Sequence, residues 1–483
     1  MPKTIKKERK NTMKKAILII LTIITCLSVA ASLSACKKKN TSESETAGQE
    51  SVEQSKENSE KQSEGKSESE TAATSESVAD NSESESNGES ESVSESESVE
   101  ESEEEREIVY TEGLEYELTA DGKSYAIKGA GTFTGSELNI PSEHDGKPVT
   151  SILSLAFTNN TGITSICIPD TITTIEENSF DHYCELSGIY YEGDIASWCS
   201  IRGLENLPLF QTFRNLYFKG KELKGTLTIP QEVSVINAAA FAACDGITEL
   251  VIAEGVTEIG FGAFLGCKEI TDITISNSVA KISTLAFTSC FALKNLTIGS
   301  GIKTIEESAF TSCFNLTNVY YVGDLASWCK IDGLANITTT ANIYIDGKEI
   351  AGDLIIPDTV TEIKEGAFYF RTKITSVTIP ESVTTIGDRA FYYCVRLSTV
   401  TMGNGVTSIG SNAFYQCVRL TNVAIGNNVT KIGGSAFMGC GKLASIKYSG
   451  TKEKWYAISK SSDWNTYTGN YVVHCTDGDI NKN

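Results

Sequence analysis

Apolar residues in this chain recur with a fixed period, measured from a phenylalanine that follows Ala or Ser. Seven of the nine intervals between these phenylalanines are 23 residues long, and the other two are 61 and 58. A period of this length is typical of stacked-repeat proteins. The phenylalanines are Phe157, Phe180, Phe241, Phe264, Phe287, Phe310, Phe368, Phe391, Phe414 and Phe437.

Each repeat has the pattern of 374–394, ITSVTIPESVTTIGDRAFYYC. Apolar residues fourteen and twelve positions before the phenylalanine alternate with polar ones and predict a strand. A second extended piece, V-T-x-I, precedes a tight turn that contains the phenylalanine. One repeat has too few apolar residues for a core of its own, so neighbouring repeats must stack. We therefore predict a leucine-rich-repeat-like solenoid over 151–445, β-rich with short turns, 3-10 pieces and a few short helices.

Two matching inserts, near 190–223 and 320–350, account for the long intervals. Each contains a predicted helix whose apolar face at i, i+3 and i+4 includes Trp198 or Trp328. That position makes each tryptophan a core residue rather than a platform for a ligand. Both inserts continue into a strand-turn-strand.

The two ends of the repeat array are predicted to form caps. Residues 108–150 include a hairpin with an Asp-Gly turn, which is typical of a solenoid's N-terminal cap. A third, weaker copy of the insert at 448–458 places a C-terminal cap and tail at 446–483.

The repeat resembles the unit of the BspA-type leucine-rich repeat family, roughly L-T-x-I-x-I-P-x-S-V-T-x-I-G-x-x-A-F-x-x-C. The resemblance covers about 151–475, with ten copies of the unit. It implies a right-handed solenoid with a strand-lined face. It also implies a cell-surface protein of a kind associated with adhesion to host proteins or to other cells, with no catalytic residues in the repeat.

Seven cysteines follow the phenylalanine by three residues and form a predicted ladder. One cysteine per repeat, with no C-x-x-C pair, is not a metal-binding pattern. We predict buried free thiols. Disulfides between neighbouring repeats are the alternative, because strand spacing falls within the Cα range that a disulfide permits. The seven are Cys244, Cys267, Cys290, Cys313, Cys394, Cys417 and Cys440.

The N-terminus has the pattern of an export signal. Residues 1–35 have the cationic start and apolar stretch of a secretory signal, and Met13 is the expected true start. Leu33-Ser34-Ala35-Cys36 resembles a bacterial lipobox, which implies a lipid on Cys36 and attachment to the outer side of the cell membrane. A single transmembrane helix is the alternative. Residues 36–107 comprise the lipid-anchored Cys36 and a Ser/Glu-rich linker, and the linker is predicted to be disordered.

The net charge of −22 is unevenly distributed. Residues 1–39 carry +9 and residues 40–107 carry −19, with 22 Glu. Residues 108–483 hold 39 acids and 27 bases. No basic patch stands out in that range, so nucleic acid is not an expected partner.

The sequence offers few candidate catalytic residues. The histidines at 144, 182 and 474 are scattered and have no recurring Ser, Cys or acid partner. A phosphate-binding loop and an H-E-x-x-H motif are absent from the sequence. We therefore predict a protein that is not an enzyme and that uses no cofactor or metal.

The candidate binding site is one corner of the last repeats, where tyrosines follow the phenylalanine on three consecutive repeats. Tyrosine and arginine most often carry interface energy. This favours a monomeric, adhesin-like solenoid with a protein ligand. The alternatives are a structural scaffold without a ligand, a carbohydrate-binding surface, or rings that only stack on one another. The candidates are Tyr369, Arg371, Tyr392, Tyr393, Arg396, Tyr415 and Arg419.

Overall fold

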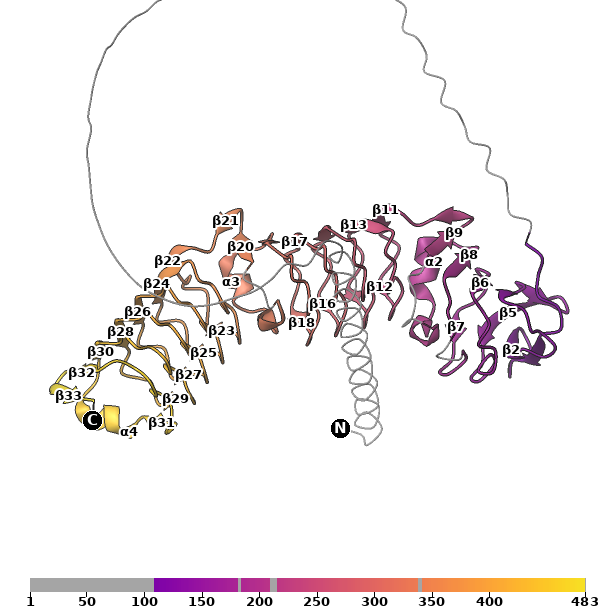
Figure 1. Ribbon diagram of the computed structural model, residues 1–483. Helices are drawn as coiled ribbons and strands as arrows, with labels where there is room; N and C mark the ends of the chain where they lie inside the picture. Colours follow the sequence, from indigo (N-terminus) through magenta and orange to yellow (C-terminus); the bar gives the residue numbers. More distant parts are fainter. Residues whose placement is uncertain (1–107, 181–183, 209–214, 338–340, 483) are drawn as a thin grey trace, which may run out of the picture. The chain divides into compact units, whose positions relative to one another are not determined.

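The computed structural model describes residues 108–180, 184–208, 215–337 and 341–482. Residues Glu105–Asn483 form one compact unit, and Figure 1 shows its coils following one another along the chain. The predicted signal peptide, Cys36 and the Ser/Glu-rich linker lie outside the described residues.

Each 23-residue repeat forms one coil of a parallel β-solenoid. In one coil, β24 (Ile374–Ile379) is the long strand and β25 (Thr385–Ile386) the short one. Val377 pairs with Val400 of the next coil in a parallel register, and both side chains are buried. The side-chain alternation expected of the first strand is confirmed, because Thr378 between the two inward positions is exposed.

The long strands form three sheets of successive coils. The first has the order β10-β9-β8-β6-β3, the second β11-β13-β15-β17-β19-β20-β21, and the third β22-β24-β26-β28-β30-β32-β33. We call the coils of these sheets the first, second and third blocks. The bounds not yet given are β3 (Glu137–Asn139), β6 (Ser165–Ile168), β8 (Gly188–Tyr191), β9 (Asn215–Phe218), β10 (Lys221–Glu222), β11 (Gly225–Ile229), β13 (Ile247–Ile252), β15 (Asp272–Ile275), β17 (Asn295–Ile298), β19 (Asn318–Tyr321), β20 (Asn342–Ile345), β21 (Lys348–Glu349), β22 (Gly352–Ile355), β26 (Thr399–Met402), β28 (Asn422–Ile425), β30 (Ser445–Tyr448), β32 (Val472–Cys475) and β33 (Gly478–Asn481).

The short strands form the second side of the coils. They pair in parallel as β12-β14-β16-β18 in the second block and β23-β25-β27-β29-β31 in the third. Their bounds are β12 (Val235–Ile236), β14 (Glu258–Ile259), β16 (Lys281–Ile282), β18 (Thr304–Ile305), β23 (Glu362–Ile363), β27 (Ser408–Ile409), β29 (Lys431–Ile432) and β31 (Ser459–Lys460).

Stacking begins earlier and ends later than the predicted 151–445. The N-terminal hairpin of β1 (Glu115–Leu118) and β2 (Tyr125–Gly129) is present, but β2 also pairs in parallel with β5 (Lys147–Ile152), so it already continues the sheet of short strands. β5 pairs in turn with β4 (Glu143–His144) and β7 (Thr174–Ile175). At the other end, β32 pairs in parallel with β30.

Each block ends in a short helix followed by an antiparallel hairpin. The helices are α2 (Ile195–Ser200), α3 (Leu325–Trp328) and α4 (Lys452–Ala457), and the first two are followed by 3-10 turns η1 (Leu204–Asn206) and η2 (Leu334–Asn336). The hairpins are β9–β10, β20–β21 and β32–β33. Figure 1 shows α2, α3 and α4 at these three places. The two inserts and the C-terminal copy are therefore one recurring unit.

The insert tryptophans join one block to the next. Trp198 and Trp328 are 0% and 3% exposed, which confirms that they are core residues. The Nε1–H of Trp198 donates to the Ala240 carbonyl, and that of Trp328 donates to the Ala367 carbonyl, both at 2.8 Å. These alanines precede the first phenylalanine of the following block, so the core continues across each insert.

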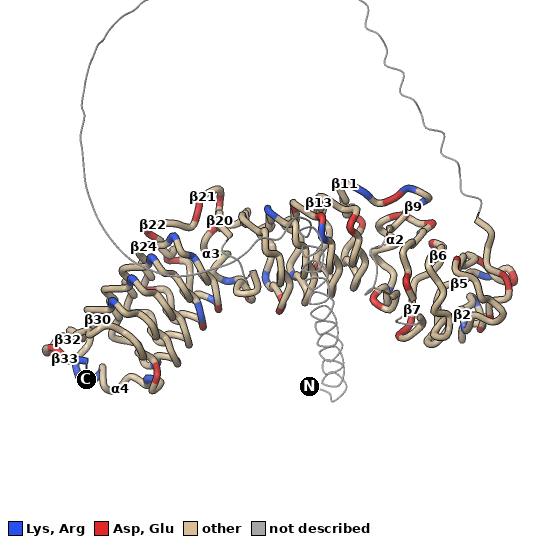
Figure 2. The backbone as a smooth tube through the Cα atoms, viewed as in Figure 1, with Lys and Arg blue, Asp and Glu red and all other residues tan. Residues whose placement is uncertain are grey.

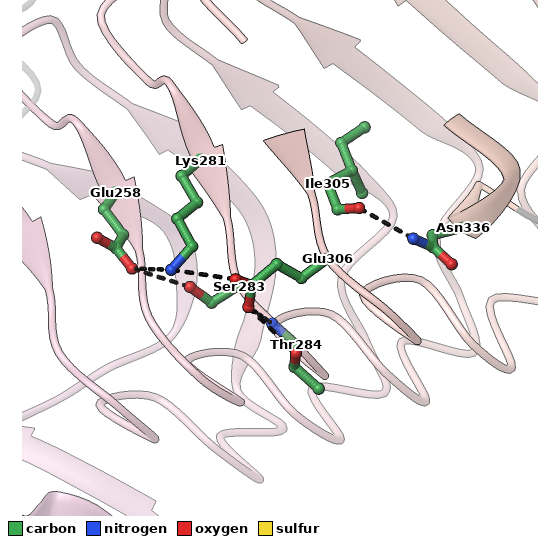
Figure 3. Close-up of polar contacts among 7 residues, drawn as sticks. All are labelled: Glu258, Lys281, Ser283, Thr284, Ile305, Glu306 and Asn336. Atoms are coloured by element: carbon green, nitrogen blue, oxygen red, sulfur yellow. Dashed lines mark hydrogen bonds and ion pairs between the residues drawn. The ribbon is translucent and has the colours of Figure 1, made fainter. Parts of the chain in front are cut away.

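The turn after α3 requires a glycine. Gly333 has φ 83°, and a Cβ there would lie 1.9 Å from the Ile305 carbonyl oxygen. The Nδ2 of Asn336 donates to the same oxygen at 2.9 Å (Figure 3). The insert thereby takes the place of a short strand beside β18.

The repeated phenylalanines form three ring stacks inside the coils. Neighbouring rings are parallel to within 19°, and their centroids lie 5.1–5.3 Å apart. The inserts separate the stacks, and the last stack ends where Trp464 packs edge-on against Phe437 at 5.9 Å. The rings therefore follow one another coil by coil instead of lying in separate cores.

The cysteine ladder consists of buried thiols. Each Sγ from the second coil of a block onward donates to the carbonyl of the phenylalanine in the preceding coil, as Cys417 does to Phe391 at 3.3 Å. The thiol therefore satisfies a buried carbonyl and also fills a small apolar space. The other such pairs are Cys267–Phe241, Cys290–Phe264, Cys313–Phe287, Cys394–Phe368 and Cys440–Phe414.

The Cys394 thiol makes the solenoid sensitive to high pH. Burial raises the pKa of Cys394 to about 12, whereas an unfolded cysteine has a pKa of about 8.5. The resulting stabilisation is complete below the unfolded pKa and is lost as pH rises toward the folded one. Between about pH 9 and pH 11 we expect wild type to lose about 1.4 kcal/mol per pH unit more than Cys394→Ala.

Urea unfolding at several pH values measures this difference. Cys394→Ala starts less stable at neutral pH because the Phe368 carbonyl loses its donor. The predicted result is a convergence of the two stabilities with rising pH, and parallel curves would contradict it.

Candidate functional site

Two columns of stacked aromatic rings lie along the turn of the third block. In the outer column, Tyr369, Tyr392 and Tyr415 stack with centroid distances of 4.9 and 4.8 Å and interplanar angles of 9° and 6°. In the second column, Phe370 stacks on Tyr393 at 4.9 Å and 10°. All five side chains are half-buried. We call these five residues the aromatic corner.

The backbone beneath the aromatic corner is held in a fixed turn. Phe370 and Tyr393 have φ values of 58° and 57°, in the left-handed region that side chains rarely adopt. Their amides donate to the carbonyls of Tyr392 and Tyr415 in the next coil, at 2.8 and 2.9 Å. Because these bonds run from coil to coil, the rings are positioned before any ligand arrives.

The hydroxyls of Tyr369 and Tyr392 stay neutral at physiological pH. Burial raises the pKa of Tyr369 and of Tyr392, and neighbouring tyrosines add to the effect. The positive charge of Arg389 acts in the opposite direction on both rings. Arg389, which forms an ion pair with Glu365 at 3.0 Å, is thus a charged neighbour of the corner that the sequence analysis did not single out.

Arg371 is buried and not exposed at the corner, which corrects the sequence prediction. Its side chain is buried, with 7% of the residue exposed. Its Nε donates to the Tyr369 carbonyl at 2.8 Å, and its Nη1 donates to the Ala341 carbonyl of the preceding insert. Arg371 occupies the place of the ladder cysteine in the first coil of the block, where the insert leaves backbone carbonyls to be satisfied. Burial lowers its pKa to about 10.

Arg396 and Arg419 are exposed, as predicted, and form a column of their own. They lie five residues after Phe391 and Phe414. Lys442 has the same position after Phe437 and is also exposed. We call Arg396, Arg419 and Lys442 the basic column.

Two features of this block escaped the sequence analysis. Phe370 belongs to the aromatic corner but occupies a position that holds Ala, Gly or Ser in several other coils, so no repeat pattern marked it. The basic column was not singled out either, because charge was summed over all of 108–483. Counting charges by coil position would have revealed the basic column.

Other places among the described residues have fewer features of a binding site. A cavity of about 290 Å³ lies between α2 and β12, lined by residues that include Ser200, Arg202 and Glu232. Within the described ranges, no three His, Cys, Asp or Glu side chains cluster as metal ligands would. Helices in the part of the chain that the structure describes are too short or too polar to cross a membrane.

Comparison with known proteins identifies the repeat. The family model of the BspA type leucine rich repeat region matches residues 128–200, 211–330 and 348–461, in six copies. Similar solved structures include a leucine rich cell surface protein from Faecalibacterium prausnitzii, with 25% identity, coverage of 73% of this chain and 98% of that one, and a TM-score of 0.43.

Two further solved structures are similar to this chain. A leucine-rich repeat protein from Bacteroides ovatus has 21% identity, coverage of 76% of this chain and 100% of that one, and a TM-score of 0.42. The pneumococcal vaccine antigen PcpA has 18% identity, coverage of 74% and 87%, and a TM-score of 0.41. Among curated proteins no match is found.

Proposed function

Because the chain belongs to the BspA-type leucine-rich repeat family, we propose that it is a cell-surface binding protein that acts as an adhesin through the aromatic corner. Members of this family are surface proteins whose repeats are generally not enzymatic. The observation that carries the proposal is the pair of half-exposed aromatic columns on a turn fixed by hydrogen bonds between coils.

The chemistry of the corner favours a protein ligand. Tyrosine offers a large contact area and a hydroxyl at low cost in side-chain entropy, and it is enriched in binding hot spots. The faces of Tyr392 are covered by Tyr369 and Tyr415, so its edge and its hydroxyl face a ligand. A sugar ring that needs an uncovered aromatic face is served less well, which places carbohydrate second.

A scaffold without a ligand explains the coils but not the corner. The coils need apolar rings only inside, where the phenylalanine stacks lie. Half-exposed tyrosines on three consecutive coils add apolar surface that a purely structural wall does not need. This difference is our reason for preferring a binding role.

The expected result for the corner is a loss of affinity in Tyr392→Ala with Arg396→Ala. We expect the double variant of residues 108–483 to bind at least fivefold more weakly, which corresponds to more than about 1 kcal/mol. The measurement is surface binding to a panel of immobilised host extracellular proteins, with purified glycans as a parallel panel. Tyr456→Ala is the control because Tyr456 is 69% exposed on α4. Unchanged affinity in the double variant would remove the corner from the proposal.

The anchor in this proposal is a lipid on Cys36, with the solenoid outside the cytoplasm. Support comes from the sequence Leu33-Ser34-Ala35-Cys36 after an apolar stretch. Cys36→Ala is expected to release the protein into the medium or to leave the precursor uncut. Membrane fractionation and mass spectrometry of the N-terminus measure both effects, and an unaltered location together with unaltered processing would show that the lipobox interpretation is wrong.

A further inference from the structure

One position of the repeat is basic in every coil of the third block. It lies five residues after the repeated phenylalanine, and Figure 2 shows Lys and Arg recurring from coil to coil between β24 and β30. The residues at this position are Lys373, Arg396, Arg419 and Lys442, the last three being the basic column. In the second block the same position holds Gly246, Glu269, Ala292 and Asn315. The repeat itself therefore does not require a base here.

The basic column is not compensated by acids of its own block. Lys373 forms an ion pair with Glu349. Arg396, Arg419 and Lys442 are exposed, and among the described residues they make no ion pair with a carboxylate. Residues 389–452 include seven Lys or Arg and no Asp or Glu, in a chain whose net charge is −22. An anion that lies along the column relieves the repulsion between these like charges.

The second block shows that coil stacking does not force like charges together. There, Lys281 lies between Glu258 and Glu306 of the adjacent coils, at 2.8 and 3.2 Å (Figure 3). Charges in successive coils therefore alternate in one block and repeat with the same sign in the other. The fold permits compensation from coil to coil, and the basic column does without it.

The basic column is accompanied by a row of polar groups on the neighbouring strands. Each of its members precedes by three residues a member of one parallel register, in which Thr399 pairs with Asn422 and Asn422 with Ser445. These register residues are at least partly exposed on β26, β28 and β30. Cations in neighbouring coils are therefore spaced by about 4.8 Å, the distance between paired strands, and hydroxyl and amide groups recur beside them at the same spacing.

This spacing distinguishes between polymers that carry repeated negative charges. In an extended polypeptide, side chains on one side recur about every 6.7 Å, and the phosphates of one strand of duplex DNA recur about every 3.4 Å. One sugar unit of a linear polysaccharide is close in length to one coil spacing. Sugar hydroxyls also match the hydroxyl and amide groups beside the column. Single-stranded nucleic acid instead needs aromatic faces on which its bases stack.

We propose that the basic column binds a linear sulfated polysaccharide, which lies along the coils with about one negative charge per sugar unit. Guanidinium and ammonium groups donate charge-assisted hydrogen bonds to the oxygens of such anions, and the register residues bond to sugar hydroxyls. Single exposed ion pairs contribute little, so the contact needs several consecutive coils. This ligand is additional to the protein ligand proposed for the aromatic corner, and its binding does not require that corner.

The first test uses residues 108–483, which contain the described fold, and a fluorescently labelled chondroitin sulfate octasaccharide. Fluorescence anisotropy measures the affinity. We expect saturable binding at about 0.05 M salt that weakens at least tenfold at about 0.2 M salt, because binding releases counterions from the polyanion. Arg419→Gln with Lys442→Gln is expected to weaken binding at least tenfold at the lower salt concentration and to make its salt dependence shallower. This variant keeps Arg396, which is substituted in the test of the aromatic corner.

Two control variants separate the charge of this column from charge in general. Lys294→Gln with Lys303→Gln removes the same charge from exposed positions of the second block and is expected to change the affinity less than twofold. Arg419→Lys with Lys442→Arg keeps the charge of the column and is expected to retain the affinity within about threefold.

The second test maps the site without substitutions. Phenylglyoxal modifies exposed arginines, and mass spectrometry quantifies the modification at each position. We expect the octasaccharide to slow the modification of Arg396 and Arg419 at least threefold. Arg202, an exposed arginine of the first block, is the internal control and is expected to react at an unchanged rate.

The proposal would be overturned by an absence of saturable binding at the lower salt concentration, by equal losses in the two double glutamine variants, or by equal protection of Arg202. Equal affinity for the desulfated octasaccharide would contradict the role of sulfate. An octaglutamate peptide or a single-stranded DNA octamer that binds as tightly would assign the surface to acidic polypeptides or to nucleic acid instead. None of these outcomes bears on the adhesin proposal, which is measured with host proteins and with Tyr392→Ala together with Arg396→Ala.

Discussion

Phe391→Ala lowers the free energy of unfolding of the solenoid by about 3–5 kcal/mol, the range for truncating a buried aromatic side chain. Phe391 is fully buried and lies between Phe368 and Phe414, at 5.1 and 5.2 Å. Its removal leaves a cavity that both neighbouring coils line, and stacked coils have no other core with which to compensate. Urea unfolding of residues 108–483, followed by far-UV circular dichroism, measures the change.

Phe314→Ala is the control for this expectation. Phe314 also stacks on a phenylalanine of the adjacent coil, Phe291 at 6.2 Å, but it is 80% exposed. We expect a change within about 0.5 kcal/mol, as for most surface substitutions. If the two variants lose similar stability, burial in the ring stack is not what holds the coils together.

Trp328→Ala is expected to remove about 3–5 kcal/mol and to separate the unfolding of the second and third blocks. The indole is 3% exposed, and its Nε1–H is the donor to the Ala367 carbonyl at the start of the third block. Neighbouring repeats are coupled through their interfaces, so a gap at this joint allows the blocks to unfold independently. A single urea transition becoming two is the predicted observation.

Trp328→Phe separates the two contributions. It retains an aromatic ring but removes the donor, which leaves a buried carbonyl unsatisfied at a cost of about 1–3 kcal/mol. We expect this variant to be intermediate in stability and to keep one transition. A single, unshifted transition in Trp328→Ala would contradict the assignment of the tryptophan as the link between blocks.

The coils were predictable because the same short pattern of apolar and polar residues determines each of them. The spacing of apolar residues around Phe391 indicates which side chains face inward, and the same reasoning assigns Trp198 and Trp328 to the core. The thiol ladder followed from one cysteine per repeat. The hydrogen bond from each thiol to the phenylalanine carbonyl of the preceding coil could not be predicted, because no sequence pattern shows which backbone groups a coil leaves unpaired.

The sites were harder to predict because they depend on departures from the repeat. Arg371 looked like a surface residue, since arginine is seldom buried. It is buried because the insert interrupts the cysteine ladder and leaves the Ala341 carbonyl to be satisfied. Phe370 and Lys442 were missed for the opposite reason: each is ordinary in its own repeat and becomes notable only beside its neighbour in the next coil.

The helix-and-hairpin unit at the end of each block also bears on how such a chain can change in length over generations. A gain or loss of 23 residues inside a block adds or removes one coil, while the hairpin still covers the last long strand. Open strand edges, which invite aggregation, are therefore not created by the change. Gene duplication within a block can vary the reach of the protein while the interfaces between its blocks stay the same.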